Sequence, residues 1–201
     1  MNLQTFILIG RSGSGKGTQA KLLEKYITEN DKENRSVYYL ETGTMFREFI
    51  QGDSFSSKLS KKIYVDSKLQ PSFLTIYFWA KALIDNLKGS EHIIIDGTPR
   101  YLDEARVLTG AMEFYLADRK PVVLYLDTTR DESKTRLQER GRIDDKNDKD
   151  IEKRLNWFET DVLKTIEFLK NNPVFEFIEI NGDQSVEDVH KEILEKTKIN
   201  G

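Results

Sequence analysis

The sequence predicts an α/β fold in which five parallel strands form a sheet flanked by helices. Short apolar runs alternate with longer segments of helical spacing, which is typical of strands joined by crossover helices. Most of these runs are apolar almost throughout, as expected for strands that helices cover on both faces. The chain has 201 residues, 38% of them hydrophobic, which suits one domain with its own core.

Five apolar runs are the predicted strands. The last of them alternates apolar and polar residues, so we place it at an edge of the sheet. The runs are Thr5–Ile9, Ser36–Leu40, His92–Ile95, Val122–Leu126 and Phe175–Ile180.

Apolar spacing and capping residues predict the helices. Apolar residues recur at steps of three and four from Ile151 to Leu169, which indicates one long helix. Ser185 begins a final helix with a capping box, and Pro71 opens another that runs through Leu87. Between these elements, Glu29–Asn34 is rich in polar residues, and we expect a solvated turn there.

Composition excludes several classes of function. With 31 basic and 34 acidic residues the net charge is −3, so no overall field attracts nucleic acid or a membrane surface. The absence of cysteine excludes disulfides, a thiol nucleophile and a cysteine-bound zinc. No apolar run reaches the length of a membrane span and no signal peptide is visible, so we expect a cytoplasmic protein.

The first predicted strand leads directly into a glycine-rich loop, Gly10–Thr18 (GRSGSGKGT), and then into a helix. Such glycines let successive backbone N–H groups surround a phosphate, the helix N-terminus adds partial positive charge, and Lys16 reaches the outer phosphates. This arrangement predicts a P-loop of the kind found in nucleotide-binding proteins. Gly17 stands where a metal-binding hydroxyl is usual, and Thr18 carries the nearest one.

Four segments resemble the motifs of adenylate kinases and their nucleoside monophosphate kinase relatives, in the order of that family. With Arg154 and Gly182, the matches extend over nearly the whole chain. The segments are Gly15–Ala20 (GKGTQA), Thr42–Arg47 (TGTMFR), Asp96–Arg100 (DGTPR) and Arg136–Asp145 (RLQERGRIDD).

The resemblance implies a P-loop core with a helical insertion that binds the monophosphate and a lid. More than 50 residues between the second and third strands also predict an insertion, because a minimal crossover needs about a dozen. The lid is very short, since only Gly141 separates two arginines. We therefore expect a core of 1–41, 87–139 and 146–201, an acceptor-binding subdomain of 42–86 and a lid of 140–145.

The implied activity is reversible transfer of the γ-phosphoryl group of ATP to AMP, giving two ADP, by a monomer that uses Mg²⁺. Two nucleotides bring on the order of six negative charges into one cleft, so the chemistry needs positioning and cations more than a covalent step. Arginine suits this role because its planar fork binds phosphate oxygens in pairs and stays charged when desolvated.

The resemblance also assigns roles to single residues. Arg47 and Arg100 would bind the acceptor's phosphate, and Arg136 would lie against the donor's base. Lys16, Arg140, Arg142 and Arg154 would surround the donor's transferring phosphoryl group. The expected catalytic residues are Lys16, Arg100, Arg140, Arg142 and Arg154. The expected ATP site comprises Gly13, Ser14, Gly15, Lys16, Gly17, Thr18, Arg136 and Gly182. The expected monophosphate site comprises Thr42, Gly43, Arg47, Leu69, Gln70, Gly97, Arg100 and Glu104.

Asp96 is the expected Mg²⁺ residue, acting through water. It ends a predicted strand, at the edge of the sheet where α/β folds bind ligands, and a single carboxylate suffices for magnesium. A helix cap is the alternative role. Thr44 stands where the family usually has an aspartate that helps order the metal's water.

The acceptor base remains open. Thr42 resembles the adenylate branch, whereas the uridylate and cytidylate branch tends to have alanine there. Glu104 replaces the usual glutamine, and an ionised carboxylate only accepts hydrogen bonds, which suits guanine better. Glu104 could also simply face solvent. GMP, UMP or CMP are therefore alternative acceptors, and a nucleotide-binding module with little catalysis is the alternative outside this reaction.

Overall fold

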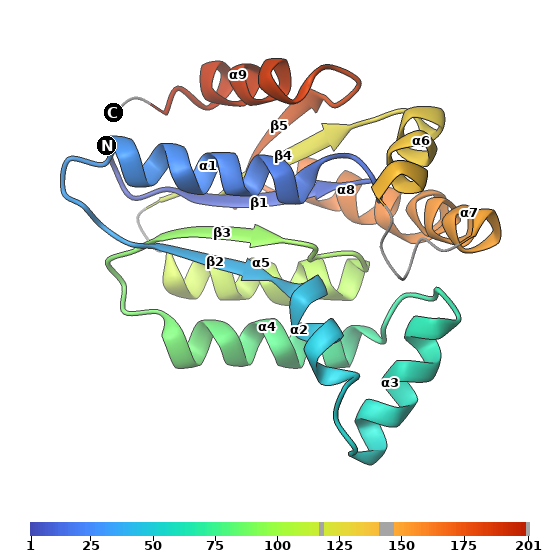
Figure 1. The fold of residues 1–201 in the computed structure, drawn as a ribbon. Coiled ribbons are helices and arrows are strands. Elements are labelled where there is room, and N and C mark those ends of the chain that lie inside the picture. Colours follow the sequence, from blue (N-terminus) through green and yellow to red (C-terminus); the bar gives the residue numbers. More distant parts are fainter. Residues whose placement is uncertain (117–118, 141–146, 200–201) are drawn as a thin grey trace.

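The computed structural model describes residues 1–116, 119–140 and 147–199 (Figure 1). Its centre is a five-stranded sheet in the order β2-β3-β1-β4-β5, and all neighbouring strands run parallel. This confirms the predicted fold class and places β5 at an edge, as expected. The strands are β1 (Thr5–Gly10), β2 (Val37–Glu41), β3 (His92–Asp96), β4 (Val122–Asp127) and β5 (Glu176–Asn181).

Helices cover both faces of the sheet (Figure 1). Along β1, Phe6 and Leu8 pack against α1 (Lys16–Asn30) and α9 (Val186–Thr197), whereas Ile7 and Ile9 face the opposite layer. That second layer contains α4 (Ser72–Asn86), α5 (Leu102–Tyr115) and α8 (Leu163–Lys170). Alternate residues of one apolar strand thus supply two cores, as expected for a strand buried on both faces.

Two predicted helix starts are confirmed, and one predicted helix is interrupted. Pro71 stands directly before α4, and Ser185 Oγ accepts a hydrogen bond from the Asp188 N–H at 3.1 Å at the start of α9. The segment 151–169 contains α7 (Asp148–Trp157), a π-helical turn, η2 (Phe158–Val162), and then α8. The expected apolar face is buried throughout, but the helix is not regular.

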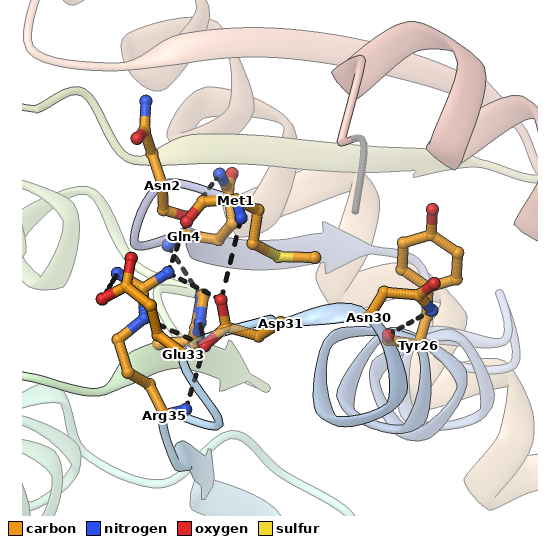
Figure 2. A network of polar contacts seen from close by, with 9 residues as sticks. Met1, Asn2, Gln4, Tyr26, Asn30, Asp31, Glu33 and Arg35 are labelled. Carbon is orange, nitrogen blue, oxygen red and sulfur yellow. Dashed lines mark hydrogen bonds and ion pairs between the residues drawn. The ribbon is translucent and has the colours of Figure 1, made fainter.

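The expectation of a solvated turn at Glu29–Asn34 is wrong for Glu29 and Asn30, which end α1, and for Asp31, which is buried (Figure 2). The Asp31 side chain is fully buried and accepts hydrogen bonds from Arg35 Nε at 2.9 Å and Arg35 Nη2 at 2.7 Å. Lys32, Glu33 and Asn34 are exposed, as expected. A polar run can therefore hide one buried carboxylate when a nearby arginine satisfies it.

The chain between β2 and β3 forms α2 (Thr42–Phe49), α3 (Phe55–Val65) and α4. Figure 1 shows α2 and α3 beyond the end of β2, whereas α4 lies along the sheet and contributes Trp79 and Leu83 to its core. In Figure 1, α6 (Arg130–Arg140) and α7 lie at the same end of the sheet as α3, in the upper part of the view. The division into subdomains stays a prediction, and the expected lid lies outside the described residues apart from Arg140.

None of the described helices is both long and apolar enough to cross a membrane.

Candidate functional site

A cleft of about 930 Å³ lies where the strands end, bordered by the loop after β1, the ends of β2 and β3, and helices α2, α6 and α7. Basic side chains outnumber acidic ones among the described residues that line it. The predicted site residues in its lining are Gly13, Gly15, Lys16, Gly17, Thr18, Thr42, Gly43, Arg47, Leu69, Gln70, Asp96, Gly97, Arg100, Glu104, Arg136, Arg140 and Arg154. Arg142 lies outside the described residues.

The loop between β1 and α1 has the backbone of a phosphate-binding turn. Gly13 and Gly15 have φ angles of 87° and 89°, a region in which side chains other than hydrogen are strained. A Cβ at Gly13 would also lie 2.6 Å from the Ser133 carbonyl oxygen. Gly15 precedes the first turn of α1, so the unpaired N–H groups of that turn face the same cleft as Lys16.

Lys16 is a partly buried cation among other cations. Its Nζ donates to the carbonyl oxygens of Gly10 at 3.0 Å and Arg11 at 2.7 Å. Burial lowers the pKa of Lys16 to about 7, with a further lowering by Arg100, Arg140 and Arg154, while Asp96 acts in the opposite direction. The protein's own groups therefore disfavour the charged ammonium, and a bound polyanion would favour it.

Asp96 ends β3 and is 7% exposed. It accepts a hydrogen bond from the Tyr39 hydroxyl at 3.3 Å. Burial raises its pKa, as does the nearby Glu41, whereas Lys16 and Arg100 lower it. The next helix, α5, begins only after Tyr101, so Asp96 is not a helix cap.

The chemistry of this carboxylate fits magnesium. Within the part of the chain that the structure describes, no group of three or more His, Cys, Asp or Glu side chains could enclose a metal. Magnesium keeps several waters and binds through one or two carboxylates together with substrate phosphates. Asp96 beside the P-loop lysine provides such an incomplete site.

The predicted acceptor residues meet on the α2 side of the cleft. Arg47 binds Glu41 and Thr44, each through a hydrogen bond of 2.6–2.7 Å. Arg100 Nε donates to the carbonyl oxygen of Gly97 at 2.9 Å. The Gly97 backbone, with φ 89°, passes so close to the Thr42 hydroxyl that a Cβ would lie 2.6 Å from it.

Glu104 does not face solvent, so that alternative is wrong. Its side chain is buried at 1% exposure, and Oε2 accepts hydrogen bonds from the Arg100 N–H at 2.8 Å and the Thr98 hydroxyl at 3.1 Å. Burial raises the pKa of Glu104, although these hydrogen bonds and the Arg100 charge act in the opposite direction. Gln70 also lines the cleft, but its amide is bound to Ser60 at 2.8 and 3.0 Å.

On the donor side, Arg136 lines the cleft and is held by Glu132 at 2.7 Å and the Gln184 carbonyl at 3.3 Å. Two predicted donor residues are not in the lining. Ser14 is buried within the loop, with its Oγ 3.4 Å from Lys16 Nζ. A Cβ at Gly182 would lie 2.0 Å from Thr128 Oγ1, so close packing requires glycine there.

Several residues of the cleft lie outside the set predicted from the sequence, among them Tyr39, Glu41, Tyr64 and Trp157. A signal existed for three of them. Tyr39 and Glu41 are two residues apart on β2, so their side chains lie on the same face of the strand. Trp157 follows Arg154 by three residues on α7, and the Arg154 guanidinium lies 5.7 Å from the centre of its ring system.

Comparisons with known proteins agree with this geometry. Residues 8–174 match the family model described as adenylate kinase. The chain is 32% identical over 180 residues to the adenylate kinase of Phocaeicola vulgatus, covering 86% of this chain and 87% of that protein. It is 29% identical over 196 residues to the uridylate kinase of Saccharomyces cerevisiae, covering 95% and 89% respectively. The chain therefore belongs to the adenylate kinase family, whose members are nucleoside monophosphate kinases.

Proposed function

We propose that this kinase transfers the γ-phosphoryl group of ATP to AMP, reversibly and with Mg²⁺, as a cytoplasmic monomer. The observation that supports this most strongly is the set of cations around Lys16. Arg100, Arg140 and Arg154 are close enough to lower the pKa of that lysine, and all three line the same cleft as the P-loop. Positive charges that repel one another in this way are useful where the cleft binds a polyanion.

The residues divide by the part of the reaction that they serve. The loop N–H groups and Lys16 hold the donor's phosphates, and Arg47 and Arg100 hold the acceptor's phosphate. Arg140 and Arg154 offset charge on the transferring group, which passes between two oxygens in line. We propose no covalent enzyme intermediate, because positioning and charge stabilisation account for the catalysis that a loose transition state needs.

Asp96 is our candidate for holding Mg²⁺, through water. When bound, the metal would neutralise charge on the donor's phosphates. Lys16 and Asp96 influence each other's pKa in opposite directions, which indicates that both face the same part of the cleft.

AMP is the acceptor that Thr42 favours, but Glu104 supports a second candidate. Oε2 already accepts hydrogen bonds from the Arg100 N–H and the Thr98 hydroxyl, and Thr75 also hydrogen-bonds this side chain, so a base that reaches Glu104 would meet a hydrogen-bond acceptor. As a carboxylate it would accept the ring N–H of uracil or guanine, whereas adenine has an acceptor nitrogen at the corresponding position. UMP or GMP is therefore the second candidate.

A panel of four nucleoside monophosphates with Mg·ATP tests the choice. We expect the highest kcat/KM with AMP, and we expect Glu104→Gln to preserve or improve AMP use. A preference for UMP or GMP that Glu104→Gln abolishes would establish the second candidate instead. ATP binding without transfer to any of the four acceptors would contradict a kinase and leave a nucleotide-binding module.

A further inference from the structure

Glu41, the last residue of β2, binds the arginine that we assign to the acceptor's phosphate. Arg47 Nη2 donates to Glu41 Oε1 at 2.7 Å and to Thr44 Oγ1 at 2.6 Å. The Thr44 hydroxyl in turn donates to Glu41 Oε2 at 2.7 Å. The three side chains form a closed ring in which both carboxylate oxygens of Glu41 and both hydrogens of Nη2 are engaged.

This ring limits how Arg47 can bind an anion. A guanidinium has two edges that can each donate two parallel hydrogen bonds, one formed by Nη1 and Nη2 and the other by Nε and Nη2. Both edges include Nη2, whose two hydrogens are already donated to Glu41 and Thr44. Arg47 therefore cannot hold a phosphate bidentately unless it leaves one of these partners.

Two members of the ring, Glu41 and Arg47, line the cleft, where a phosphate would meet them. Glu41, Gly43 and Arg47 all line the cleft, and a Cβ at Gly43 would lie only 3.1 Å from Arg47 Nη1. The side chains of Arg47 and Glu41 are 36% and 28% exposed. An ion pair with this much exposure is weak, so a more highly charged anion can replace it.

The pairing with Arg47 also compensates the negative charge of Glu41. Glu41 is the register partner of Asp96 on the neighbouring parallel strand, so the two carboxylates lie side by side at the end of the sheet. The Glu41 charge is one of the causes that raise the pKa of Asp96. Arg47 therefore offsets a repulsion that the sheet itself imposes.

We propose that Glu41 determines specificity by occupying Arg47 in place of the acceptor's phosphate, so that a terminal phosphate with two negative charges displaces it and a singly charged phosphodiester does not. This inference rests on the proposed function, in which Arg47 binds the acceptor. Competition from the Glu41 carboxylate would let the protein discriminate among anions, which Arg47 alone would not do.

Glu41→Gln tests the proposal, because the amide keeps the size of the side chain and can still accept from Thr44. Calorimetric titration with AMP, without a donor nucleotide, should show binding about fivefold tighter than in the wild type. The monomethyl ester of AMP, which carries one negative charge, should bind the wild type more weakly than AMP. The variant should reduce that preference.

Two further variants isolate the contact. Glu48→Gln makes the same change of charge at an exposed position on α2, the helix that carries Arg47, and AMP affinity should not change. In an Arg47→Ala background, Glu41→Gln should have no effect, because the group for which phosphate and carboxylate compete is gone. Circular dichroism and thermal melting establish that each variant is folded.

Unchanged or weaker AMP binding in Glu41→Gln would overturn the proposal, since it would mean that the ring has no effect on phosphate binding or assists it.

The binding measurement does not depend on turnover. Tighter binding in a protein that transfers no phosphoryl group would leave the Glu41 inference standing and reject the proposed function. If another monophosphate proves to be the acceptor, that nucleotide and its methyl ester replace AMP. If none of the four binds, both proposals fail.

Discussion

The two ends of the sheet both bury charge, but they compensate it differently. At the amino end, the Asp31 carboxylate accepts hydrogen bonds from Arg35 (Figure 2). His92 Nε2 lies 3.4 Å from the same carboxylate. At the carboxyl end, Lys16 donates to loop oxygens and is surrounded by arginines whose charges oppose its own. Side chains of the fold itself compensate the buried charge at the amino end, whereas the charges at the carboxyl end are arranged to bind an anion.

The pKa shifts express the same contrast. Hydrogen bonds from Arg35 hold the pKa of Asp31 well below its usual range, so folding favours the charged carboxylate. Burial lowers the pKa of Lys16 to about 7, so folding disfavours the charged ammonium. A buried charge with its partner marks a structural site, whereas a buried charge among like charges marks a binding site.

The largest expected effect concerns the carboxyl end. Lys16→Met should lower turnover by about 10²–10³-fold, because it removes a cation directed at the charge that develops on the transferring group. The melting temperature should not fall, since the substitution also removes a desolvated charge. Lys32→Met, an exposed lysine at the opposite end, serves as the control. Near-normal turnover in Lys16→Met would reject the role assigned to Lys16.

The converse effect is expected at the amino end. Asp31→Asn should lower the melting temperature by several degrees, because Arg35 and His92 lose a buried ionic partner, while kcat at a temperature well below the melting point stays unchanged. Glu33→Gln changes the charge of an exposed neighbour of Arg35 and should have little effect. A loss of activity in folded Asp31→Asn would show that the two ends are coupled.

Nucleotide binding should take up protons above neutral pH. At pH 8 a lysine with a pKa of about 7 is mostly neutral, and bound phosphates would raise that pKa and protonate it. ATP titrations in buffers of different ionisation enthalpy should show uptake of part of a proton at pH 8 and less at pH 6. Lys16→Met should abolish the difference, and uptake that persists in the variant would have to come from another group.

A smaller effect is expected from acid. Because the pKa of Asp31 is lowered in the folded protein, its stabilising contribution is present above the ordinary aspartate range and is lost as pH falls below roughly 4. The stability of Asp31→Asn should therefore fall less steeply with acid than that of the wild type. Parallel melting curves from pH 6 to pH 3 would contradict this.

Local patterns predicted most of the fold. Apolar runs located all five strands, and Ser185 and Pro71 marked helix starts, because strand burial and capping depend on residues near in sequence. The sequence did not predict the burial of Asp31 or the π-helical turn at Phe158–Val162. Arg35, the main partner of Asp31, is only four residues away, but Asp31 also contacts His92, which is far away in the sequence, and no local pattern shows that second contact.

The candidate site shows the same limit. Motifs placed Lys16, Arg100 and Arg154 in one cleft, but no motif contains Glu41. Its position beside Asp96 follows from the register of two strands that are separated by 50 residues, and its bond to Arg47 follows from how α2 leaves β2. Contacts set by register are visible only in the folded chain.

The structure with a bound dinucleoside polyphosphate, two adenosines joined through a phosphate chain, tests the central claim most directly. We predict that Lys16, Arg47, Arg100 and Arg154 all lie within hydrogen-bond distance of its phosphate oxygens. Phosphates bound away from these four side chains would contradict the account.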